Sequence, residues 1–337
     1  MRFKDKKVLV TGGAGFCGSN LVKKLAEEGA DITVLDDLFT GVLSLIENIP
    51  NVTFVKGSVT DFDLVEDLVK KADVVFNLAA RNIIVSTQRP REDFKVNAGG
   101  MLNVLIAAKK YGIEKIVYTS SASVYGNPRY LPINEDDGLR ILNPYAASKH
   151  SAENYCMAFW ESYDVPVTIL RYSNVYGTNQ SPLNPYCGVV SKFFEAVLND
   201  LPPQIHGDGE QTRDFTYVDD TVEATMLAAL SPKAVGEVLN VGTGKETSVN
   251  QLAKSILAIS GKNIDPIYVD RRDIDNLRRR VLNIEKIRKN LRWIPSTPLE
   301  KGLSQTFAWL HSVEDSRIQI VNGEDKSSPQ VAALRAN

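Results

Sequence analysis

The first half of the chain alternates short runs of β-branched residues with longer stretches in which apolar residues recur every three or four positions. The longer stretches, such as 19–28 and 97–111, have the spacing of amphipathic helices. Strands that alternate with such helices are typical of βαβ units, whose strands lie parallel in one sheet. The pattern therefore predicts an α/β fold with a doubly wound parallel sheet. Its strands are expected at 8–10, 32–35, 52–55, 74–78, 115–118 and 167–170.

A looser pattern begins near Gly177, where connections rich in Pro, Asn and Gly separate two helical stretches at 189–198 and 218–229. We expect residues 1–176 to form the main domain, with later strands returning to its sheet. Residues 177–313 should form mainly a smaller α/β lid that is interleaved with that sheet. The polar segment 314–337 lacks sustained periodicity and is expected to be a flexible tail.

Composition and charge exclude several classes of protein. The 337 residues are 43% hydrophobic, which is enough for a substantial core, and their formal net charge of -2 leaves no basic field for nucleic acid. No apolar run approaches the length of a membrane span, and the first strand begins too early to leave room for a signal segment. We therefore expect a cytoplasmic protein without nucleic-acid or membrane partners.

The residues that could bind a metal ion or pair in disulfides are scattered. The three cysteines and three histidines have no paired ligand spacing, so we expect no metal site and no disulfide. Five arginines cluster within 271–280, but Asp273 and Asp275 interrupt them. This cluster is interpreted as a solvated face or a small anion site.

Three glycines, Gly12, Gly15 and Gly18, follow the first strand at every third position and open into a helix. Such glycines let the chain turn tightly and bring backbone N–H groups against a pyrophosphate, which the positive end of the helix stabilises. A tight turn alone would need the same glycines. The second strand, however, ends at Asp36, whose carboxylate can accept hydrogen bonds from both hydroxyls of a ribose. The segment therefore predicts a dinucleotide site.

The carboxylates of Asp36 and Asp37 also favour one dinucleotide. A carboxylate repels the additional phosphate of NADP, and no Arg or Lys adjoins the two aspartates in the sequence. We therefore expect the cofactor to be NAD.

Tyr145 and Lys149 lie four residues apart, a spacing that puts both on one face of a helix. A tyrosine with a pKa of about 10 is a poor base at neutral pH, but an adjacent ammonium and a positive nicotinamide stabilise its phenolate. Tyr145 could then take a proton from a substrate hydroxyl while hydride leaves the same carbon. An isolated pair of this kind is common on helix surfaces. Ser121 strengthens the case, because it ends the strand that begins at Lys115, at the edge where open α/β sheets bind ligands.

These segments together resemble the extended short-chain dehydrogenase/reductase family. The resemblance covers about residues 6–311 and rests on the glycine loop, the serine segment 119–126, Tyr145 with Lys149, and the segment 171–177. It implies a Rossmann domain with tightly held NAD, a nucleotide-sugar in the C-terminal lid, and a homodimer built through a four-helix bundle. Within the family, the chain is similar to the NAD-dependent nucleotide-sugar epimerases and dehydratases.

The residues after Ser121 distinguish members of this group. Related sugar 4,6-dehydratases carry Asp-Glu there and UDP-glucuronate decarboxylases carry Thr-Ser-Glu, whereas this chain has Ala122 and Ser123. Neither side chain can act as a carboxylic acid. What remains is most similar to the UDP-glucose 4-epimerases, which oxidise C4, let the 4-keto sugar turn and return the hydride to its other face. The resemblance thus implies C4 epimerisation of a UDP-hexose or UDP-hexuronic acid.

The resemblance also assigns site residues. Catalysis falls to Ser121, Tyr145 and Lys149. The expected contacts of NAD are Gly12, Gly15, Phe16, Cys17, Gly18, Asp36, Asp37, Ser58, Val59, Leu78, Ala79, Ala80, Asn97, Tyr145, Lys149 and Tyr172. The expected contacts of the substrate are Arg81, Ser121, Ser123, Tyr145, Asn174, Val189, Arg213, Arg272 and Arg280.

Two positions depart from the cofactor side of the family pattern. Ser58 stands where many relatives have an Asp that holds the adenine amino group, so adenine recognition is weaker or rests on Val59. Arg81 follows Asn77-Leu78-Ala79-Ala80, where relatives begin with His-Leu-Ala-Ala, and it either faces the substrate or points to solvent.

Three arginines in the second half of the chain are candidate substrate contacts, and the sequence leaves their roles open. Arg213 binds a phosphate of the substrate, or it forms a surface ion pair with Asp214. Arg272 is aligned with a second diphosphate contact. Arg280 falls near the position that sets room for sugar substituents, where it could pair with a C6 carboxylate.

Other functions stay open beside epimerisation. A keto-sugar reductase or alcohol dehydrogenase uses the same catalytic residues with free NAD(P), and decarboxylases and dehydratases share the fold. A non-catalytic NAD-binding protein of this fold would commonly lack Tyr145 or Lys149, and this chain has both.

Overall fold

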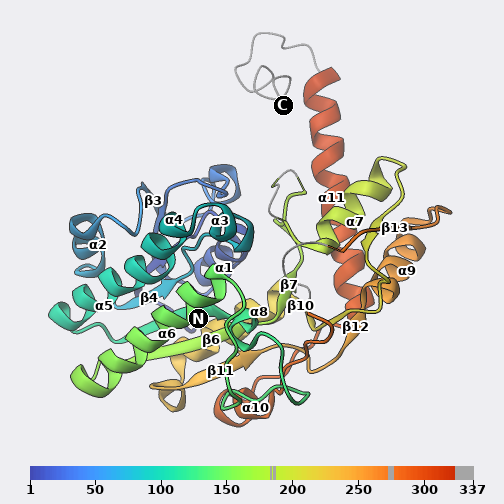
Figure 1. The fold of residues 1–337 in the computed structure, drawn as a ribbon. Helices are drawn as coiled ribbons and strands as arrows, with labels where there is room; N and C mark the ends of the chain where they lie inside the picture. The colour runs from blue at the N-terminus through green and yellow to red at the C-terminus, as the bar shows by residue number, and fades with distance from the viewer. Residues whose placement is uncertain (183, 185–186, 272–276, 323–337) are drawn as a thin grey trace.

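In the part of the chain that the structure describes, residues 1–182, 184, 187–271 and 277–322, seven parallel strands form one central sheet (Figure 1). The structure is a computed structural model. The strand order is β11-β6-β5-β4-β1-β2-β3, and every neighbouring pair is parallel. This order confirms the predicted doubly wound α/β fold. The strands are β1 (Lys7–Thr11), β2 (Asp31–Asp36), β3 (Val52–Lys56), β4 (Val74–Asn77), β5 (Lys115–Ser121), β6 (Val167–Tyr172) and β11 (Val238–Val241).

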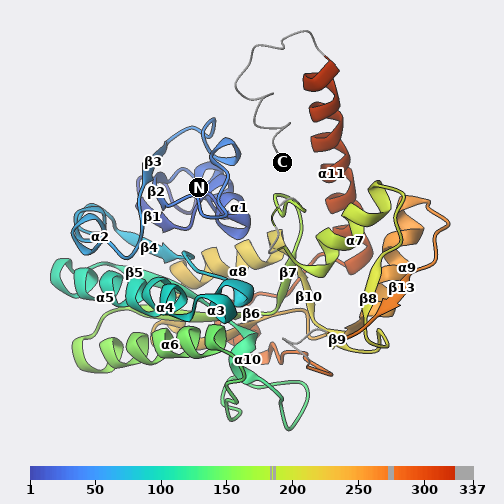
Figure 2. The ribbon, with the colours of Figure 1, turned by 45° about the horizontal axis from the view of Figure 1, so that its top comes forward.

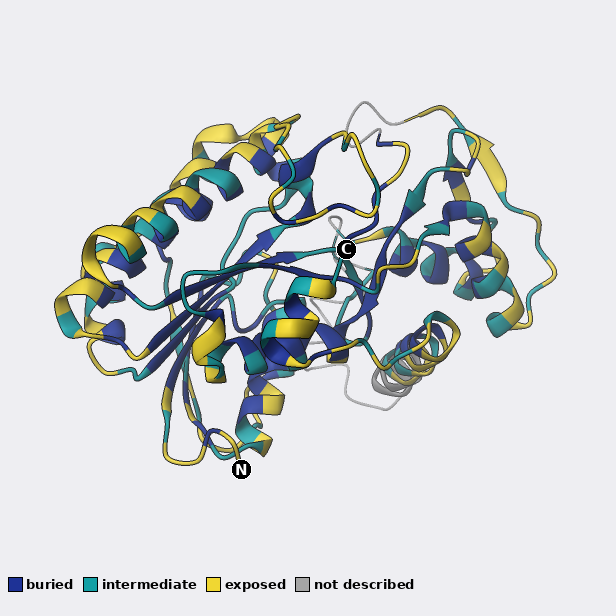
Figure 3. Cartoon of the chain, turned by 90° about the horizontal axis from the view of Figure 1, so that it is seen from below, coloured by how far each residue is buried: buried dark blue, intermediate teal, exposed yellow. Residues whose placement is uncertain are grey.

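Helices cover both faces of this sheet. Alternate residues of a strand point to opposite faces, so Val8 and Val10 of β1 join one hydrophobic cluster and Leu9 joins the other. Figure 3 shows the strands buried and the outward helix faces exposed. The first cluster is covered by α1 (Phe16–Glu27), α8 (Val218–Leu230) and α10 (Glu285–Leu291), and the second by α2 (Phe62–Val69), α5 (Gly100–Tyr111) and α6 (Pro144–Tyr163).

Several short helices and turns connect the strands, and two of the long helices, α5 and α6, have defined starts. The helix expected at 97–111 is α5, which begins at Gly100 after a π-helical turn at Lys95–Gly99. The capping residue of α6 is Asn143, whose side chain accepts a hydrogen bond from the Ala146 N–H at 2.9 Å. The remaining short helices are α3 (Ile83–Gln88), α4 (Pro90–Phe94) and 3-10 turns at Leu43–Leu45, Ala122–Tyr125 and Pro232–Ala234.

A smaller lobe lies at one side of the sheet, where α7, α9 and α11 gather in Figures 1 and 2. Its two-stranded pairs are β8 with β13 and β9 with β12, while β7 pairs with β10 beside the main sheet. The bounds are α7 (Val189–Leu198), α9 (Val249–Ser260), α11 (Leu299–Asn322), β7 (Asn174–Tyr176), β8 (Gln204–His206), β9 (Thr212–Arg213), β10 (Phe215–Tyr217), β12 (Thr247–Ser248) and β13 (Ile267–Val269).

The second half of the chain contributes to both parts. β11, α8 and α10 belong to the central sheet and its helical layers, whereas α7 and α9 belong to the smaller lobe. The domain boundary at 176/177 stays a prediction. The helix α11 continues to Asn322, past residue 314 where the expected tail begins, and the flexibility of that tail stays a prediction. Among the helices of the described residues, none is both long enough and apolar enough to cross a membrane.

Candidate active site

The glycine loop joins β1 to α1 through close backbone approaches. Gly12 has a φ of +71°, and a Cβ there would lie 2.7 Å from the backbone nitrogen of Ala79. A Cβ on Gly18 would collide with the carbonyl oxygen of Gly12. Gly15 is the N-cap of α1, whose uncharged first turn presents backbone N–H groups and the positive end of the helix dipole. These features fit the pyrophosphate of a dinucleotide.

Asp36 is buried at the end of β2, beside this loop. The Ala14 N–H donates to one carboxylate oxygen at 3.0 Å, and the Leu38 N–H donates to the other at 2.8 Å. Burial raises the pKa of the Asp36 carboxyl, although the two N–H donors oppose the rise. The carboxylate is thus fixed next to the glycine loop, where the ribose of NAD is expected.

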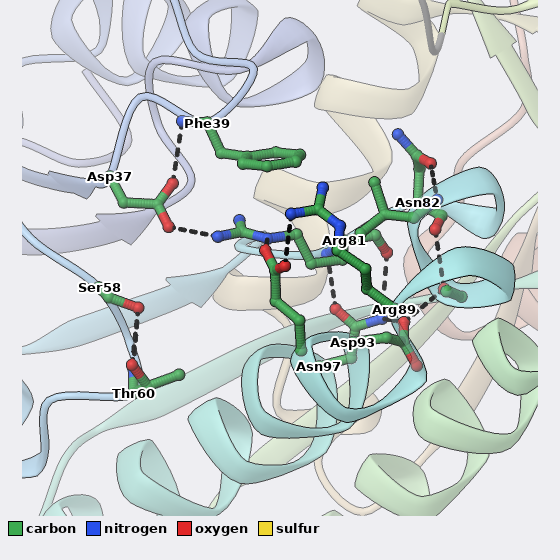
Figure 4. Close-up of polar contacts among 12 residues, drawn as sticks. Asp37, Phe39, Ser58, Thr60, Arg81, Asn82, Arg89, Asp93 and Asn97 are labelled. Carbon is green, nitrogen blue, oxygen red and sulfur yellow. Dashed lines mark hydrogen bonds and ion pairs between the residues drawn. The ribbon is translucent and has the colours of Figure 1, made fainter.

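Asp37 and Arg81 form an ion pair that the sequence reasoning missed. Arg81 Nη2 lies 2.7 Å from Asp37 Oδ2, Arg81 Nε lies 2.7 Å from Glu92 Oε1, and the guanidinium lies 4.0 Å from the ring centroid of Phe39 (Figure 4). Asp37 follows β2 and Arg81 follows β4, and these two strands flank β1 in the sheet. The ion pair therefore joins the segments after β2 and β4, on the two sides of the glycine loop that follows β1.

This ion pair corrects two expectations. Arg81 does not point to solvent, because its side chain is only 11% exposed and is held by Asp37 and Glu92. Its expected contact with the substrate stays a prediction. A cation does adjoin the two aspartates in space, so the charge of Asp37 no longer argues against NADP. The electrostatic argument for NAD rests on Asp36.

The other expected cofactor residues lie at the same edge of the sheet. Ser58 and Val59 follow β3, and the Ser58 hydroxyl lies 2.9 Å from that of Thr60 (Figure 4). Leu78, Ala79 and Ala80 follow β4 and approach the glycine loop through Ala79. The Tyr172 hydroxyl, at the end of β6, is hydrogen-bonded to Thr225 at 2.6 Å.

Asn97 contacts the backbone after β4. Its Oδ1 accepts from the Arg81 N–H at 2.7 Å and its Nδ2 donates to the Arg81 carbonyl at 3.1 Å. The side-chain amide thereby fixes the segment that follows Ala80.

Ser121, Tyr145 and Lys149 meet at the carboxyl end of β5. Ser121 ends this strand, and its side chain is hydrogen-bonded to Tyr145. Lys149, one turn further along α6 than Tyr145, donates from Nζ to the Thr119 carbonyl at 2.8 Å. Ser123 joins the group, since its hydroxyl lies 3.1 Å from that of Ser121. The structure thus brings together the three side chains that the sequence assigns to catalysis.

Burial is the largest influence on the pKa values of Tyr145 and Lys149. It raises the pKa of Tyr145 to about 12, against the hydrogen bond from Ser121 and the charge of Arg280, which lower it. It lowers the pKa of Lys149 to about 8. Lys149 is not among the main groups that shift the Tyr145 pKa, so the stabilisation of the phenolate by Lys149 stays a prediction. Burial keeps Tyr145 protonated at neutral pH.

A cavity of about 680 Å³ opens between the sheet edge and the smaller lobe. Asn174, Val189 and Arg213 line it, as expected for substrate residues. Arg213 is buried and donates to the carbonyl of Leu277 at 2.9 Å. Asp214 accepts from the Thr243 and Gly244 N–H groups, so it serves to hold a loop. Arg271 and Arg278, from the arginine cluster interpreted as a solvated face or a small anion site, also line it. Among the lining residues that the sequence did not indicate are Ile83, Ile84, Lys192, Gln204, His206 and Gln211.

Arg280 contacts Asn174 of the cavity wall and also acts on Tyr145. It is 5% exposed, its Nη2 lies 3.4 Å from Asn174 Oδ1, and its charge acts on Tyr145. Arg272 lies outside the described residues. Among the described residues, no group of His, Cys, Asp and Glu side chains could hold a metal ion.

Known proteins resemble this chain over nearly its whole length. The sequence model of the NAD-dependent epimerase/dehydratase family matches residues 8–242. A Methanocaldococcus jannaschii protein, provisionally named UDP-glucose 4-epimerase, is 41% identical over 306 residues, which are 90% of this chain and 98% of that protein. The UDP-glucose 4-epimerase of Mycolicibacterium smegmatis is 38% identical, with 91% and 99% covered.

A solved structure is also similar to this chain over nearly its whole length. The UDP-glucose 4-epimerase of Thermotoga maritima, in complex with UDP-glucose, superposes with a TM-score of 0.88 at 37% identity, covering 91% of this chain and 99% of that one. Proteins named for other reactions are also similar. A Bacillus cytotoxicus UDP-N-acetyl-alpha-D-glucosaminuronate decarboxylase is 32% identical and covers 92% of this chain and 99% of its own length. A mouse dTDP-D-glucose 4,6-dehydratase is 35% identical, with 90% and 88% covered.

Proposed function

Because the chain belongs to the NAD-dependent epimerase/dehydratase family, we propose that it inverts C4 of a UDP-sugar through a transient 4-keto intermediate. NAD is its cofactor, as the resemblance to extended short-chain dehydrogenases/reductases predicted. The observation that carries the proposal is the meeting of Ser121, Tyr145 and Lys149 at the end of β5, next to Ala122 and Ser123 in place of carboxylates. The relatives named UDP-glucose 4-epimerase support it.

The side chains divide the proton chemistry between them. Tyr145 accepts the proton of the C4 hydroxyl and later returns it, and Ser121 hydrogen-bonds the Tyr145 hydroxyl and the reacting oxygen. Lys149 supplies a buried positive charge, and its Nζ is fixed by a hydrogen bond to the Thr119 carbonyl. This charge would stabilise the Tyr145 phenolate when it forms. NAD, when bound, supplies the hydride acceptor and a positive ring.

The proposed cofactor site follows the edge of the sheet. The N–H groups of Phe16, Cys17 and Gly18 would hold the pyrophosphate and Asp36 the ribose, because a helix N-terminus and a fixed carboxylate fit those groups. The buried Val59 and the segment that follows β4 would complete the adenine and nicotinamide ends.

The proposed substrate site is the cavity between the two lobes. Its volume of about 680 Å³ suits a nucleotide-sugar, and Arg213 and Arg278 both line it. A guanidinium fork is well shaped for a diphosphate oxygen pair. Asn174 lies in the same wall, towards Arg280 and Tyr145. This order supports a sugar held near Tyr145 and a diphosphate held further out.

Dehydratase and decarboxylase activities are the alternatives, since proteins of both names are similar to this chain. Elimination of water from such sugars needs a carboxylic acid near the reacting carbons. Ala122 and Ser123 follow Ser121 here, and this is the reason to prefer epimerisation.

We also propose a homodimer built on α5 and α6. The two helices pack against each other on one outer face of the sheet, and large apolar side chains stand exposed on and beside them: Phe94 (57%), Ile106 (40%), Tyr155 (43%) and Tyr163 (49%). A second copy of the same surface would cover them.

The test is turnover of a substrate panel. The purified protein, without added NAD, is incubated with UDP-hexoses and UDP-hexuronic acids, and products are identified by NMR. We expect a C4-inverted product from at least one of them. Failure with the whole panel, together with oxidation of added NADH by a 4-keto sugar, would replace the proposal with a reductase.

A further inference from the structure

Asp93 is a buried carboxylate on α4, behind the catalytic residues. Its side chain is 1% exposed, and its Oδ1 accepts hydrogen bonds from Ser86 Oγ and Asn97 Nδ2, both at 2.6 Å. The hydroxyl of Ser148 is also hydrogen-bonded to this carboxylate. Burial raises the pKa of the Asp93 carboxyl above its usual value, and these neutral donors, together with the charge of Lys149, oppose the rise.

Two of these partners, Asn97 and Ser148, connect Asp93 to the segment after β4 and to the helix that carries Tyr145 and Lys149. Asn97 holds the N–H and carbonyl of Arg81, which follow the cofactor-lining segment after β4. Ser148 lies between Tyr145 and Lys149 on α6, where its hydroxyl lies 3.0 Å from the Tyr145 carbonyl and 3.1 Å from Asn97 Nδ2. A single carboxylate therefore links the β4 loop to the catalytic helix.

Lys149 is close enough to this carboxylate, and to several other groups, for their charges to act on each other. Asp93 approaches from α4, Glu153 and Cys156 from α6, and Tyr118 from β5. Burial raises the pKa of the Cys156 thiol and the Tyr118 phenol well above their usual ranges, so both are neutral.

Glu153 contributes less than Asp93 to the charge balance of Lys149. Arg171 donates to its two oxygens at 3.0 and 2.8 Å, and His150 lies 3.4 Å away. Asp93, with neutral donors, is the largest influence that holds the pKa of Lys149 up against burial.

We propose that Asp93 is a positioning residue of this site: it fixes Asn97 and Ser148 and acts as the counter-ion that keeps Lys149 charged. The consequence for turnover rests on the proposed epimerase function. The electrostatic part concerns Lys149 alone and can be measured without substrate.

The test compares Asp93→Asn with Ser86→Ala. Asparagine keeps the shape and removes the charge, whereas Ser86→Ala removes one donor to Asp93 and keeps the charge. Lysines labelled with ¹³C at Cε are titrated by NMR, and Lys149 is assigned by its absence in Lys149→Met. In Asp93→Asn we expect the proton affinity of Lys149 to fall by about tenfold, which is one pKa unit. In Ser86→Ala it should stay at the wild-type value.

A second measurement needs no variant. In the wild-type protein, the Lys149 signal should also respond at acidic pH, when Asp93 takes up a proton. A Lys149 titration that is the same in Asp93→Asn and wild type would overturn the proposal, as would a signal that stays flat down to the acid limit of the fold.

The pH dependence of turnover connects the two proposals. If Lys149 must be charged, the basic limb of the rate profile should move to lower pH in Asp93→Asn and stay in place in Ser86→Ala. A purely structural role of Asp93 would lower the rate without moving the limb, and that result would overturn the counter-ion. An inactive wild type whose Lys149 still depends on Asp93 would refute the epimerase and leave the counter-ion standing.

Discussion

Tyr145 has an environment suited to a proton acceptor that acts only in the loaded enzyme. Burial raises its pKa to about 12, and Ser121 and Arg280 bring it down only in part. The phenol thus holds its proton until a further positive charge arrives next to it. In the proposed cofactor site, bound NAD would bring such a charge to this edge of the sheet.

The first prediction concerns the hydroxyl of Tyr145. Tyr145→Phe removes the proton acceptor and keeps the ring, so turnover should fall by about 10²- to 10⁴-fold. Bound NAD should be retained. The control is Tyr130→Phe, because Tyr130 is 74% exposed. Turnover and NAD content are measured on both variants, and wild-type turnover in Tyr145→Phe would contradict the assignment.

Arg280 is the residue whose charge bears on substrate choice. Its guanidinium acts on Tyr145 and lies against Asn174, so it lies near the proposed sugar position. Arg280→Ala should reduce turnover of UDP-glucuronate more than that of UDP-glucose, because a C6 carboxylate loses its partner. The ratio of the two kcat/KM values is the measurement. An unchanged ratio would count against a contact with C6.

At the scale of single elements, β5 begins with Lys115, a buried lysine that destabilises the fold, and ends with Ser121, the proposed catalytic serine. Lys115 begins the strand and is 4% exposed, with Nζ 3.4 Å from the Ser231 carbonyl. Burial lowers its pKa to about 8 from 10.5. The unfolded chain therefore binds more protons between these two pH values, and stability rises with pH across that window.

Lys115→Met should accordingly stabilise the protein in a pH-dependent way. The penalty is fully present below about pH 8 and disappears as pH rises through 10.5. We expect up to about 3 kcal/mol of added stability at pH 7 and a smaller gain at pH 10. Urea unfolding at both pH values measures it, with the exposed Lys4→Met as control. An equal gain at pH 7 and pH 10 would contradict the assignment to a buried charge.

The link between β2 and β4 concerns how the cofactor is held. Arg81 joins Asp37 and Glu92 across the glycine loop, so Arg81→Ala should free both segments. We expect bound NAD to dissociate about three- to tenfold faster, as for a contribution near 1 kcal/mol. Arg89→Ala is the matched control, since Arg89 lies 5.3 Å from the same Phe39 ring and pairs with Glu92. An equal rate of NAD release from both variants would contradict the proposal that the Arg81–Asp37 ion pair helps to hold NAD.

Some elements could be predicted from sequence and others could not, for a physical reason. The strand runs and the Tyr145–Lys149 spacing are local patterns, and both predicted structure that is present. The Arg81–Asp37 pair depends on β1 lying between β2 and β4, which no local pattern contains. The raised pKa of Tyr145 likewise depends on burial by other elements. α11 extends past residue 314 although the sequence there lacks the sustained apolar period that marks a helix.

In the whole molecule, the cavity proposed to bind the substrate lies where the two lobes meet. Asn174 and Arg213 were predicted from motifs, whereas Lys192, Gln204 and His206 come from α7 and β8, whose packing over the sheet edge left no signal in the sequence. The catalytic side chains lie on the sheet side of this boundary. In the proposed function, the sheet side would supply the chemistry, and residues from both sides of the boundary would bind the substrate.

The central claim is that hydride leaves C4 of a UDP-sugar and returns to the opposite face of the same carbon. The most direct test uses a UDP-sugar from the active panel that carries deuterium at C4, incubated with the purified protein and an excess of unlabelled NADH. We predict a C4-inverted product that retains its deuterium at C4. A product that is not inverted, or deuterium that is lost from C4 to C6 or to the free cofactor, would contradict the account.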